Sequence, residues 1–570
     1  MSLNSRITLS FMMVLGCSTG KTTVDMGDGE VVESGDDSGS DPADEQDDTG
    51  SGGSDTGGDD TGSGGSDTGD GSESDTGGDT PAPYPTTLRA AAETTGRVVG
   101  VAANTGAFGS DSDYLAILVE EFGGITPENA TKWSSVQVDE ATWDFSIADA
   151  MVEVAEDADM RVKGHTLVWH NQMPSWIDET MSVSELRDAM DLHSQTTLEH
   201  FGSRIADWDV VNEAFEWDGS LRASVYWLVF GPSYLAESFT RAATYAPDAR
   251  LFYNDYSIEG LNRKSDAVLS MVEDFQTDGV PIDGVGLQMH LTHGQSPSRD
   301  DLKANMARFG ELGLVVHVSE MDVQIRHLQG PESERLLAQA MTYYDVTSAC
   351  VEVEACEQMG FWGYTDRYSW IDSWYGDDDP LLYDEDLAPK PARTAVFEAL
   401  MGEPMTGCED SRLVNGDFES GLDDWTTWGS TLTAVTEPVF SGTTASLSTD
   451  RDHFWQGPVQ SVLDRIGDGL RYEGEAWVRL RNADSADMKM TLYWEDDDGE
   501  HWSTVATGVA SLDDWTLLSG IVDWREDQTV GTVRQASLYI EGPDAGVEFY
   551  TDAVTFRPVC PETSIPVEAR

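Results

Sequence analysis

Two kinds of hydrophobic pattern alternate between residues 88 and 403. Residues 113–122, 149–160, 183–201 and 263–275 are amphipathic, which predicts helices with one buried face. Short apolar runs predict strands buried on both faces at 98–103, 124–128, 161–169, 208–213, 251–255, 284–290, 315–320 and 360–365. Strands that alternate with helices predict a parallel sheet. Eight of them suit a closed (β/α)8 barrel, the TIM-barrel fold of the α/β class.

Almost every predicted strand ends in side chains that hydrogen-bond, ionise or stack. These residues are Asn104, Glu128, Asn129, Lys132, His165, Trp169, His170, Asn212, Glu213, Asn254, Asp255, Gln288, His290, Glu320, Asp322, Trp362 and Asp366. In a barrel the carboxyl ends of all strands point into one mouth, where active sites lie. A doubly wound open sheet would gather only some of these residues. We therefore expect one site at the barrel mouth.

Glu213 and Glu320 each close a β-branched apolar run. A charge at the end of a buried strand is costly unless it emerges at an open mouth, so two such ends suggest a shared cleft. Glycosidic bond cleavage needs such a pair, with one carboxyl protonated and the other ionised. Carboxyls roughly 5 to 5.5 Å apart would give retention of configuration, but the sequence does not fix that distance.

The remaining strand-end residues suit an uncharged, polyhydroxylated ligand. Indoles pack on sugar faces, and amides, imidazoles and carboxylates bond hydroxyl groups. Metal chemistry would be the competing interpretation of His165, His170 and His290. No His-x-x-x-His or similar ligand spacing accompanies them, so we expect catalysis without a metal or other cofactor.

Residues 411–558 have a different hydrophobic pattern. Short runs in which apolar and polar residues alternate occur at 472–480, 488–494 and 536–541, between turns of Gly, Asp and Asn. This pattern predicts an all-β sandwich of the jelly-roll kind. The 570 residues exceed what one core normally spans, which agrees with at least two domains.

Acidic residues dominate the chain, whose formal net charge is −72. Residues 21–85 contain 19 acidic residues against Lys21 and almost nothing to bury, so we expect a disordered, extended stalk. Removing that tract's −18 from −72 leaves −54 on the rest. Such a charge argues against nucleic acid or an anionic membrane surface as partner. Adaptation to high salt and a simple solubility bias are both open explanations.

The first residues carry Arg6 and then an apolar run at 7–15, which is too short to span a bilayer. Its ending, Val14-Leu15-Gly16-Cys17, resembles a bacterial lipoprotein signal. That resemblance implies cleavage before Cys17 and lipidation of its thiol. We therefore expect an exported cell-envelope lipoprotein, surface-exposed or released, that meets the membrane only through its lipid. An ordinary secretory signal is the alternative.

Export permits disulfide bonds, and the five cysteines can be divided into one lipidated cysteine and two disulfide pairs. With Cys17 lipidated, proximity pairs Cys350 with Cys356, and the remaining two pair as Cys408 with Cys560. Other pairings remain open at this point.

Six motifs occur in order: GHTLVWH at 164–170, WDVVNE at 208–213, LFYND at 251–255, GLQMH at 286–290, SEMD at 319–322 and FWGYTD at 361–366. Together they closely resemble glycoside hydrolase family 10 over residues 88–403. The resemblance implies a retaining endo-1,4-β-xylanase that hydrolyses internal β-1,4-xylosidic bonds of xylan. The rivals are a β-1,4-glucanase or aryl-cellobiosidase of the same fold, and a non-catalytic surface protein that binds polysaccharide. The loop closed by Cys350 and Cys356 also matches a disulfide often present in this family.

The same resemblance assigns roles at matching positions. Glu213 would be the acid/base and Glu320 the nucleophile, which His290 would hydrogen-bond. Asn212 would bond the 2-hydroxyl of the sugar at the cleavage point. The expected contacts with the sugars on the non-reducing side, including two covering indoles, are Glu128, Asn129, Lys132, His165, Trp169, Gln288, Trp362 and Trp370. A structural network at the barrel rim is the alternative for Glu213, Glu320, Lys132, Asn254 and Asp322. Plain core packing is the alternative for Trp169 and Trp370.

Three motifs of the second domain, LVNGDFE at 413–419, WQGP at 455–458 and LYIEGP at 538–543, resemble carbohydrate-binding modules of families 4, 9 and 22. By that similarity Trp455, Tyr539 and Glu541 would contact a ligand. Trp425, Trp428, Trp494 and Trp502 could be ligand contacts or core. Two further acids, Asp417 and Asp552, could hold a structural calcium, or they could be ordinary surface acids.

The expected organisation is a signal at 1–16, an acidic linker at 17–85, a catalytic domain at 86–404, a binding module at 408–560 and a tail at 561–570. We expect a monomer whose partner is xylan or a related β-1,4-linked polysaccharide.

Overall fold

The structure is a computed structural model that describes residues 84–524 and 531–563. The expected signal segment, the lipidation at Cys17 and nearly all of the acidic linker lie outside the described residues, as do residues 564–570. No helix within the described ranges is long and apolar enough to cross a membrane.

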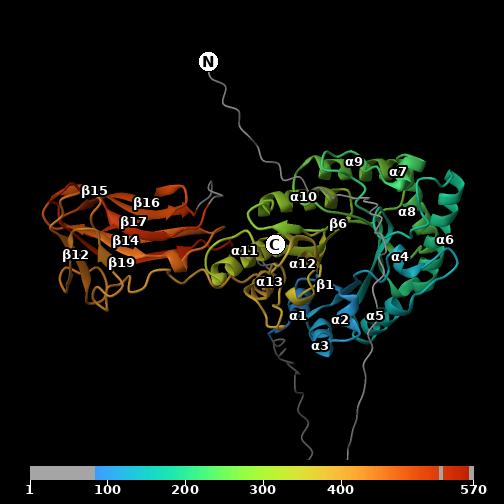
Figure 1. Cartoon of the computed structure of the whole chain (residues 1–570), viewed down its shortest axis with the longest axis horizontal. Helices are drawn as coiled ribbons and strands as arrows, with labels where there is room; N and C mark the ends of the chain where they lie inside the picture. The colour runs from blue at the N-terminus through green and yellow to red at the C-terminus, as the bar shows by residue number, and fades with distance from the viewer. Residues whose placement is uncertain (1–83, 525–530, 564–570) are drawn as a thin grey trace, which may run out of the picture. The chain divides into compact units, whose positions relative to one another are not determined.

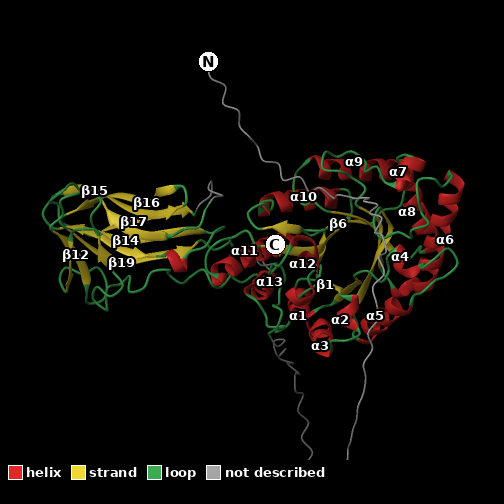
Figure 2. Ribbon diagram, in the orientation of Figure 1, coloured by secondary structure: helices red, strands yellow, loops and turns green. Residues whose placement is uncertain are grey.

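Eight parallel strands close into a ring in the first domain (Figures 1 and 2). Their order around the ring is β6-β5-β4-β3-β2-β1-β9-β8, and a parallel pairing between β8 and β6 closes it. The strands are β1 (Val98–Ala103), β2 (Gly124–Pro127), β3 (Arg161–Trp169), β4 (Asp207–Asn212), β5 (Arg250–Asp255), β6 (Gly284–Leu287), β8 (Val315–Gln324) and β9 (Cys356–Phe361). A ninth strand, β7 (His290–Thr292), extends the sheet beside the end of β8. The predicted barrel is therefore confirmed.

Helices surround this ring in Figure 2. They are α1 (Leu88–Thr94), α2 (Thr105–Phe108), α3 (Ser112–Glu121), α4 (Trp133–Val136), α5 (Ser146–Asp157), α6 (Val183–Phe201), α7 (Val225–Phe230), α8 (Ser233–Tyr245), α9 (Arg263–Asp278), α10 (Arg299–Glu311), α11 (Glu332–Glu352), α12 (Trp370–Tyr375) and α13 (Pro391–Met401). The four helices predicted from periodicity correspond to α3, α5, α6 and α9. Helix α6 begins with a capping box in which Ser182 and Glu185 bond each other's backbone, which fixes its start.

Three predicted strands differ from the structure by more than one residue. The strand predicted at 315–320 continues as β8 to Gln324, where it pairs with β7. The run at 284–290 is split, because Met289 has a φ of 59° that a continuing strand cannot accommodate. The last strand spans Cys356–Phe361 rather than 360–365, since its pairing with β8 already begins at Cys356 opposite Val316. Residues 362–365 therefore lie beyond the strand.

Close packing explains one glycine of the barrel wall. A Cβ atom at Gly164 would lie 2.3 Å from the ring of Trp208 on the adjacent strand. Trp208 is fully buried, so its ring has no room to move away. The neighbouring strands can approach only because position 164 has no side chain.

The second domain consists of two five-stranded antiparallel sheets. One sheet has the order β10-β13-β18-β15-β16 and the other β11-β12-β19-β14-β17. The strands are β10 (Thr426–Thr427), β11 (Thr431–Val435), β12 (Ala445–Thr449), β13 (Pro458–Ser461), β14 (Arg471–Leu480), β15 (Ser485–Asp496), β16 (Gly499–Ser511), β17 (Thr516–Asp523), β18 (Gln535–Glu541) and β19 (Phe549–Pro558). Alternate residues such as Met488, Met490, Leu492 and Trp494 of β15 are buried in the core, as strand geometry requires. This is the predicted sandwich.

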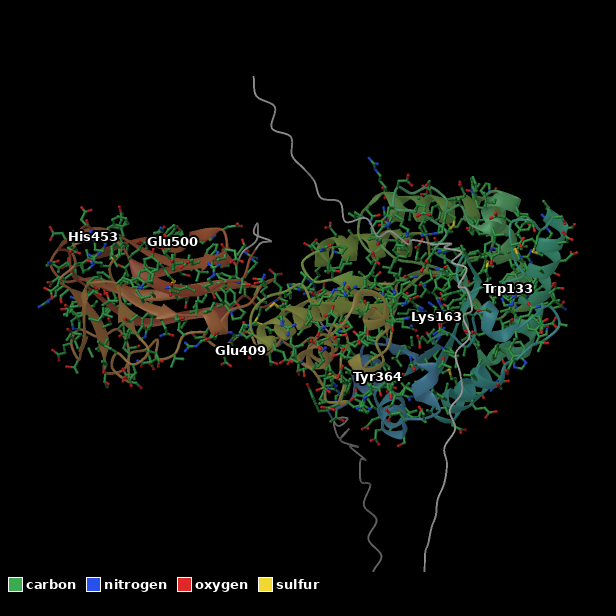
Figure 3. All side chains as sticks on the ribbon, viewed as in Figure 1. Trp133, Lys163, Tyr364, Glu409, His453 and Glu500 are labelled. Carbon is green, nitrogen blue, oxygen red and sulfur yellow. A yellow bond between two sulfur atoms is a disulfide. The ribbon has the colours of Figure 1, made fainter. Side chains whose placement is uncertain are left out.

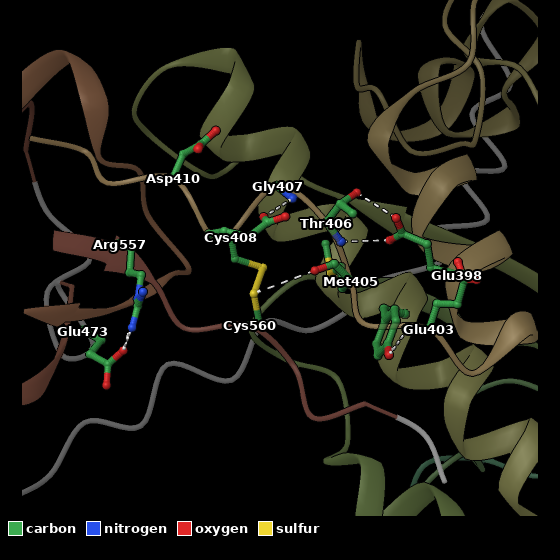
Figure 4. The surroundings of a disulfide bond; sticks show 12 residues. Glu398, Glu403, Met405, Thr406, Gly407, Cys408, Asp410, Glu473, Arg557 and Cys560 are labelled. Carbon is green, nitrogen blue, oxygen red and sulfur yellow. Dashed lines mark hydrogen bonds and ion pairs between the residues drawn. A yellow bond between two sulfur atoms is a disulfide. The ribbon is translucent and has the colours of Figure 1, made fainter. Parts of the chain in front are cut away.

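Both predicted disulfides are present. Cys350 and Cys356 join the end of α11 to the start of β9. Cys408 and Cys560, which lie on either side of the second domain in the sequence, form the bond shown in Figure 4.

Candidate active site

Glu320 lies in β8 and is 4% exposed. Its Oε1 accepts a hydrogen bond of 2.5 Å from Asn254 Nδ2 at the end of β5. Its Oε2 lies 3.2 Å from Nε2 of His290, the first residue of β7. Two different strands thus hold the two carboxylate oxygens in place.

Electrostatics keep Glu320 ionised. Burial alone would raise the pKa of this carboxyl. The hydrogen bonds from His290 and Asn254 and the nearby His165 outweigh burial and lower its pKa from 4.5 to about 2. Burial would likewise lower the pKa of His290, but Asp322 Oδ2 at 2.7 Å and Glu320 raise it to about 10. The histidine is therefore a cation between two carboxylates at neutral pH.

Glu213 directly follows β4 and has a left-handed φ of 56°. A non-glycine residue in this region is strained, and such strain is typical of functional sites. Its backbone N–H donates to Asn254 O at 2.9 Å, which holds the turn against β5. Its Oε2 accepts from Trp169 Nε1 at 2.9 Å and its Oε1 from Gln288 Nε2 at 3.2 Å. The side chain is 13% exposed, more than that of Glu320.

A layer of amides connects the two glutamates. The amide of Asn212 lies 3.0 Å from that of Asn254 and 3.1 Å from that of Gln288. Asn254 also bonds Glu320, and Gln288 also bonds Glu213. These side chains come from the ends of β4, β5, β6 and β8, which are consecutive around the ring. The structure therefore brings both carboxylates into the same mouth.

Lys132 lies in the loop after β2 and contacts several side chains of the barrel mouth. Its ammonium donates to Asn129 Oδ1 and Gln172 Oε1, both at 2.7 Å, and lies 4.8 Å from the centre of the Trp169 ring. Burial lowers the pKa of Lys132 to about 8, while the charges of Glu320, Glu128 and Glu213 oppose that shift. The pKa of this lysine therefore depends on the charges of both candidate catalytic carboxylates.

Glu128 lies beside this lysine and accepts hydrogen bonds from Asn129 Nδ2 at 2.9 Å and Asn104 Nδ2 at 3.1 Å. Burial raises its pKa. Glu128 also lines a small pocket together with Trp362 and Trp370. The carboxylate and the indoles therefore border one recess.

The two indoles that follow β9 lie next to the imidazoles of the site. The Trp362 ring is 5.1 Å from the ring of His165, and that of Trp370 is 5.0 Å from the ring of His290. Trp370 Nε1 also donates to Asp322 Oδ2 at 2.9 Å. Each indole is partly buried, which leaves part of its surface available to a ligand.

Sequence reasoning missed several polar residues that support the site. Gln172 bonds Lys132, Arg222 Nε donates to Glu213 O at 3.0 Å, and Lys163 forms a 2.8 Å ion pair with Asp209. Lys163 is labelled in Figure 3. Gln172 and Arg222 lie in loops without a periodic pattern, so no local signal identifies them. Lys163 is a charged residue inside the apolar run of β3, which is a signal in the sequence. Its partner Asp209, however, depends on how β3 and β4 pair.

Two histidines of the mouth, His165 and His290, are paired with carboxylates. Nδ1 of His165 lies 2.9 Å from Asp209 Oδ2, and His290 bridges Asp322 and Glu320. Among the described residues there is no group of three or more His, Cys, Asp or Glu side chains that could hold a metal ion.

The second domain carries an aromatic cluster outside its main core. Tyr539 of β18 packs with Val459 and Tyr493, and Trp428 lies over them, 4.9 Å from the ring of Tyr539. Trp502, whose ring centre is 5.5 Å from that of Tyr493, is 55% exposed. These residues occupy the face of the sheet opposite the core.

Glu541 is on the same face as Tyr539 by strand alternation, and it accepts from Thr491 Oγ1 at 2.6 Å. Trp455 lies outside this cluster, in the loop before β13, where its ring is 5.1 Å from that of His453. Trp425 and Trp494 are core residues, which resolves two of the four tryptophans left open by the sequence.

The two acids considered for calcium do not fit that ion well. Asp552 Oδ2 accepts from the backbone N–H groups of Phe440 and Ser441, and its Oδ1 from that of Ala553. A calcium ion would have to displace these donors. Asp417 is exposed and accepts from the backbone of Glu419.

Comparison with known proteins agrees with this geometry. Residues 87–399 match the model of the family described as glycosyl hydrolase family 10, and residues 411–546 match a carbohydrate binding domain. Endo-1,4-beta-xylanase B of Thermotoga neapolitana is 38% identical over 289 residues, which are 50% of this chain and 83% of that protein. Endo-1,4-beta-xylanase 1 of Humicola insolens is 36% identical over 306 residues, 53% of this chain and 71% of that protein.

Solved structures agree as well. Native xylanase 10B of Thermotoga maritima is 39% identical with a TM-score of 0.53, over 55% of this chain and 98% of that one. Xylanase 10B of Thermotoga petrophila, solved in complex with xylobiose, is 37% identical with a TM-score of 0.53, over 56% of this chain and 98% of that one. Since the family match covers more than half of the 570 residues, the chain belongs to glycosyl hydrolase family 10.

Proposed function

We propose that this chain is a retaining endo-1,4-β-xylanase in which Glu320 is the nucleophile and Glu213 the acid/base. The observation that carries the proposal is the asymmetry of the two carboxyls in one mouth. Glu320 is buried and held ionised by a cationic histidine. Glu213 is more exposed and bonded by the neutral donors Trp169 and Gln288. Membership of a family of retaining enzymes supports the same assignment.

In the first step a carboxylate oxygen of Glu320 attacks the anomeric carbon of the xylose at the cleavage point. The glycosidic bond breaks as Glu213 gives its proton to the leaving oxygen, and a covalent glycosyl-enzyme forms. Water then attacks the anomeric carbon while Glu213 takes a proton from it, and Glu320 is released. Two inversions give net retention.

The surrounding residues suit this sequence of steps. His290 keeps the nucleophile free of a proton, and Asn254 fixes its other oxygen. Asn212, which contacts Asn254 and Gln288, would bond the 2-hydroxyl at the cleavage point. Lys132, Asn129, Glu128 and the indoles of Trp169, Trp362 and Trp370 would bind the sugars on the non-reducing side.

The second domain would keep the enzyme on its polysaccharide. The exposed indole of Trp502 offers a stacking surface, with Trp428 and Glu541 on the same face. Uncharged sugar chains suit this face because aromatic stacking does not require a charge on the ligand.

We also propose that the full chain is exported and anchored by a lipid on Cys17. The support is the motif Val14-Leu15-Gly16-Cys17 after a short apolar run. Expression of the full chain in a bacterial host fed with labelled fatty acid should label the protein, and Cys17→Ser should not be labelled. An unlabelled parent chain would contradict the anchor.

The function is tested by incubating the full chain with xylan, mixed-linkage β-glucan and cellulose, and comparing it with Glu213→Gln and Glu320→Gln. We expect reducing ends to be released from xylan, and to be lost in both variants. Proton NMR of the first product should show the β-anomer. Faster turnover of β-glucan would select the glucanase alternative, and binding to xylan without turnover would select the non-catalytic one.

A further inference from the structure

The aromatic cluster described above lies on only one of the two sheets of the second domain. The other sheet, β11-β12-β19-β14-β17, also carries aromatic side chains on the face opposite the core. They are Phe440 in the loop between β11 and β12, Trp477 of β14, Trp515 just before β17 and Tyr550 of β19. None of the four belongs to the hydrophobic clusters that the described residues form. Packing of the core therefore does not explain them.

These four rings contact one another. Phe440 lies flat on Trp477, with 3.9 Å between the ring centres and an interplanar angle of 13°. The ring of Trp515 is 6.0 Å from that of Phe440 and 6.5 Å from that of Tyr550. Phe440 is 40% exposed, and the other three are partly buried. Single exposed apolar residues are common on protein surfaces, but four contacting rings make a continuous aromatic patch.

A buried carboxylate holds the loop that carries Phe440. Asp552 of β19 is fully buried, and its Oδ2 accepts hydrogen bonds from the N–H groups of Phe440 at 2.7 Å and Ser441 at 3.1 Å. Its Oδ1 accepts from Ala553 N at 2.7 Å. Three backbone donors thus offset the cost of burying this acid. The ring of Phe440 is in place before a ligand arrives, which reduces the entropy lost on binding.

An arginine without a carboxylate partner adjoins the patch. Arg479 of β14 lies opposite Tyr550 of β19, and its Nε donates to Leu512 O at 3.0 Å. The other arginines of β14 and β19 form ion pairs at 2.8 and 2.9 Å, namely Arg471 with Asp523 and Arg557 with Glu473, the second of which is drawn in Figure 4. Within the described residues Arg479 forms no such pair. In a chain with 105 acidic and 33 basic residues, its charge is available to a ligand.

This combination of groups indicates the chemistry of the ligand. Aromatic rings bind the flat, uncharged faces of pyranoses, and a guanidinium binds a carboxylate through two N–H groups. A β-1,4-linked sugar chain with uronic acid side groups offers both features. The match of residues 411–546 to a carbohydrate binding domain favours such a chain. A second copy of this strongly acidic protein would instead bring like charges together.

We propose that Phe440, Trp515 and Arg479 form a second polysaccharide-binding site, which takes a β-1,4-linked chain with uronic acid side groups. The rings pack on pyranose faces, and Arg479 pairs with a side-group carboxylate. The inference rests on the polysaccharide binding proposed above for this domain, and it adds a site on the sheet that does not carry Trp502. Two sites on one domain strengthen retention on a polymer, because the second contact forms at high effective concentration.

The test measures dissociation constants by isothermal titration calorimetry on the full chain carrying Glu320→Gln, which prevents turnover. The ligands are soluble glucuronoxylan and the same polymer after chemical reduction of its carboxyl groups to alcohols. In about 0.15 M NaCl the Debye length is about 8 Å, so distant acidic residues are screened while a direct ion pair persists. We expect the glucuronoxylan to bind about threefold more tightly than the reduced polymer.

Substitutions at Arg479 test the charged contact. Arg479→Gln should remove the preference for glucuronoxylan and change the affinity for the reduced polymer less than about twofold. Arg479→Lys keeps the charge and should retain most of the preference. The matched control is Arg471→Gln, since that arginine is already paired with Asp523, and it should leave the preference unchanged.

Substitutions of apolar residues test the stacking contact. Trp515→Ala should weaken the binding of both polymers about fivefold, because one aromatic contact contributes about this much. Ile521→Ala removes an apolar side chain that is 45% exposed on β17 of the same sheet, and it should bind both polymers like the parent. Trp502→Ala should weaken both polymers equally and keep the preference, because Trp502 lies on the other sheet.

Several results would overturn the proposal. One is equal affinity of the parent for the two polymers, and another is a preference that survives Arg479→Gln. Loss of the preference in Arg479→Lys as well would mean that the residue only supports its loop. Light scattering that shows a dimer, converted to a monomer by Trp515→Ala, would mean that a second copy covers the patch. If the parent binds neither polymer, the proposed polysaccharide binding itself is wrong, and this result is distinguishable from the others.

Discussion

His290 should determine how far the activity extends into acid. The nucleophile must be ionised to attack, so the acid limb of kcat/KM follows the pKa of Glu320 in the free enzyme. In the structure that pKa lies at about 2 instead of 4.5. One unit corresponds to 1.36 kcal/mol, so the difference amounts to about 3 kcal/mol of preferential stabilisation of the carboxylate.

Replacing His290 by Gln removes the positive charge and leaves a neutral amide of similar reach. The hydrogen bond from His290 is the largest of the influences that lower the pKa of Glu320, and its charge adds to it. Because burial then acts with less opposition, the pKa of Glu320 should rise, and the acid limb should move upward by at least about one pH unit. The parent enzyme should remain active well below pH 4.5, where an ordinary carboxyl would be half protonated.

The assay is kcat/KM on soluble xylan between about pH 2.5 and pH 8 at constant ionic strength. The control is His327→Gln, the same change at an exposed histidine on the barrel, which should leave the limb in place. An acid limb of His290→Gln within about 0.3 pH unit of the parent would refute the reasoning. It would mean that the charge of His290 does not set the ionisation of the nucleophile.

Three other changes test separate parts of the structure. Glu213→Gln should lower kcat/KM on xylan at least about hundredfold, and much less on an aryl xylobioside, because kcat/KM reports the first step and that leaving group needs no proton there. Trp502→Ala should weaken retention on insoluble xylan several-fold and leave kcat/KM on xylopentaose unchanged, because this indole lies on the second domain. Replacing both Cys408 and Cys560 by Ser should lower the free energy of unfolding in urea by about 5 kcal/mol, since the bond closes a loop of 152 residues.

Each of these has its own control and its own contradicting result. Trp425→Phe, a change in the core, should leave retention on xylan nearly intact, and an equal loss there would mean that Trp502 acts through folding. The Cys350/Cys356 pair spans only six residues, so its removal should cost about 2 kcal/mol. Equal costs for the two disulfides would contradict the loop-length argument. A Glu213→Gln variant with unchanged kcat/KM on xylan would exclude the assigned acid.

The sequence by itself determined the barrel, the sandwich and the residues at the mouth. Burial in a parallel barrel strand imposes a continuous apolar run, so the ends of β1, β3 and β5 could be placed within a residue of where they lie. The ordered motifs determined the family, because each motif places a functional group at a fixed distance from a strand end. The number and proximity of four cysteines predicted the pairing that the structure confirms, although they left other pairings open.

Tertiary structure decided what surrounds those residues. That Lys163 neutralises Asp209, that Gln172 bonds Lys132, and that Arg222 links Glu213 to Tyr256 depends on which strands and loops become neighbours. The break of the predicted strand at Met289 and the exposure of Trp217 depend on the same packing. The hydrophobic period of a segment shows which positions are buried, because the buried face of a helix or strand recurs at each helical turn or at every second residue. Contacts between distant segments produce no periodic pattern in the sequence. The ionisation of Glu320 and the contact of Trp217 with Tyr256 beside Glu213 therefore follow only from the folded chain.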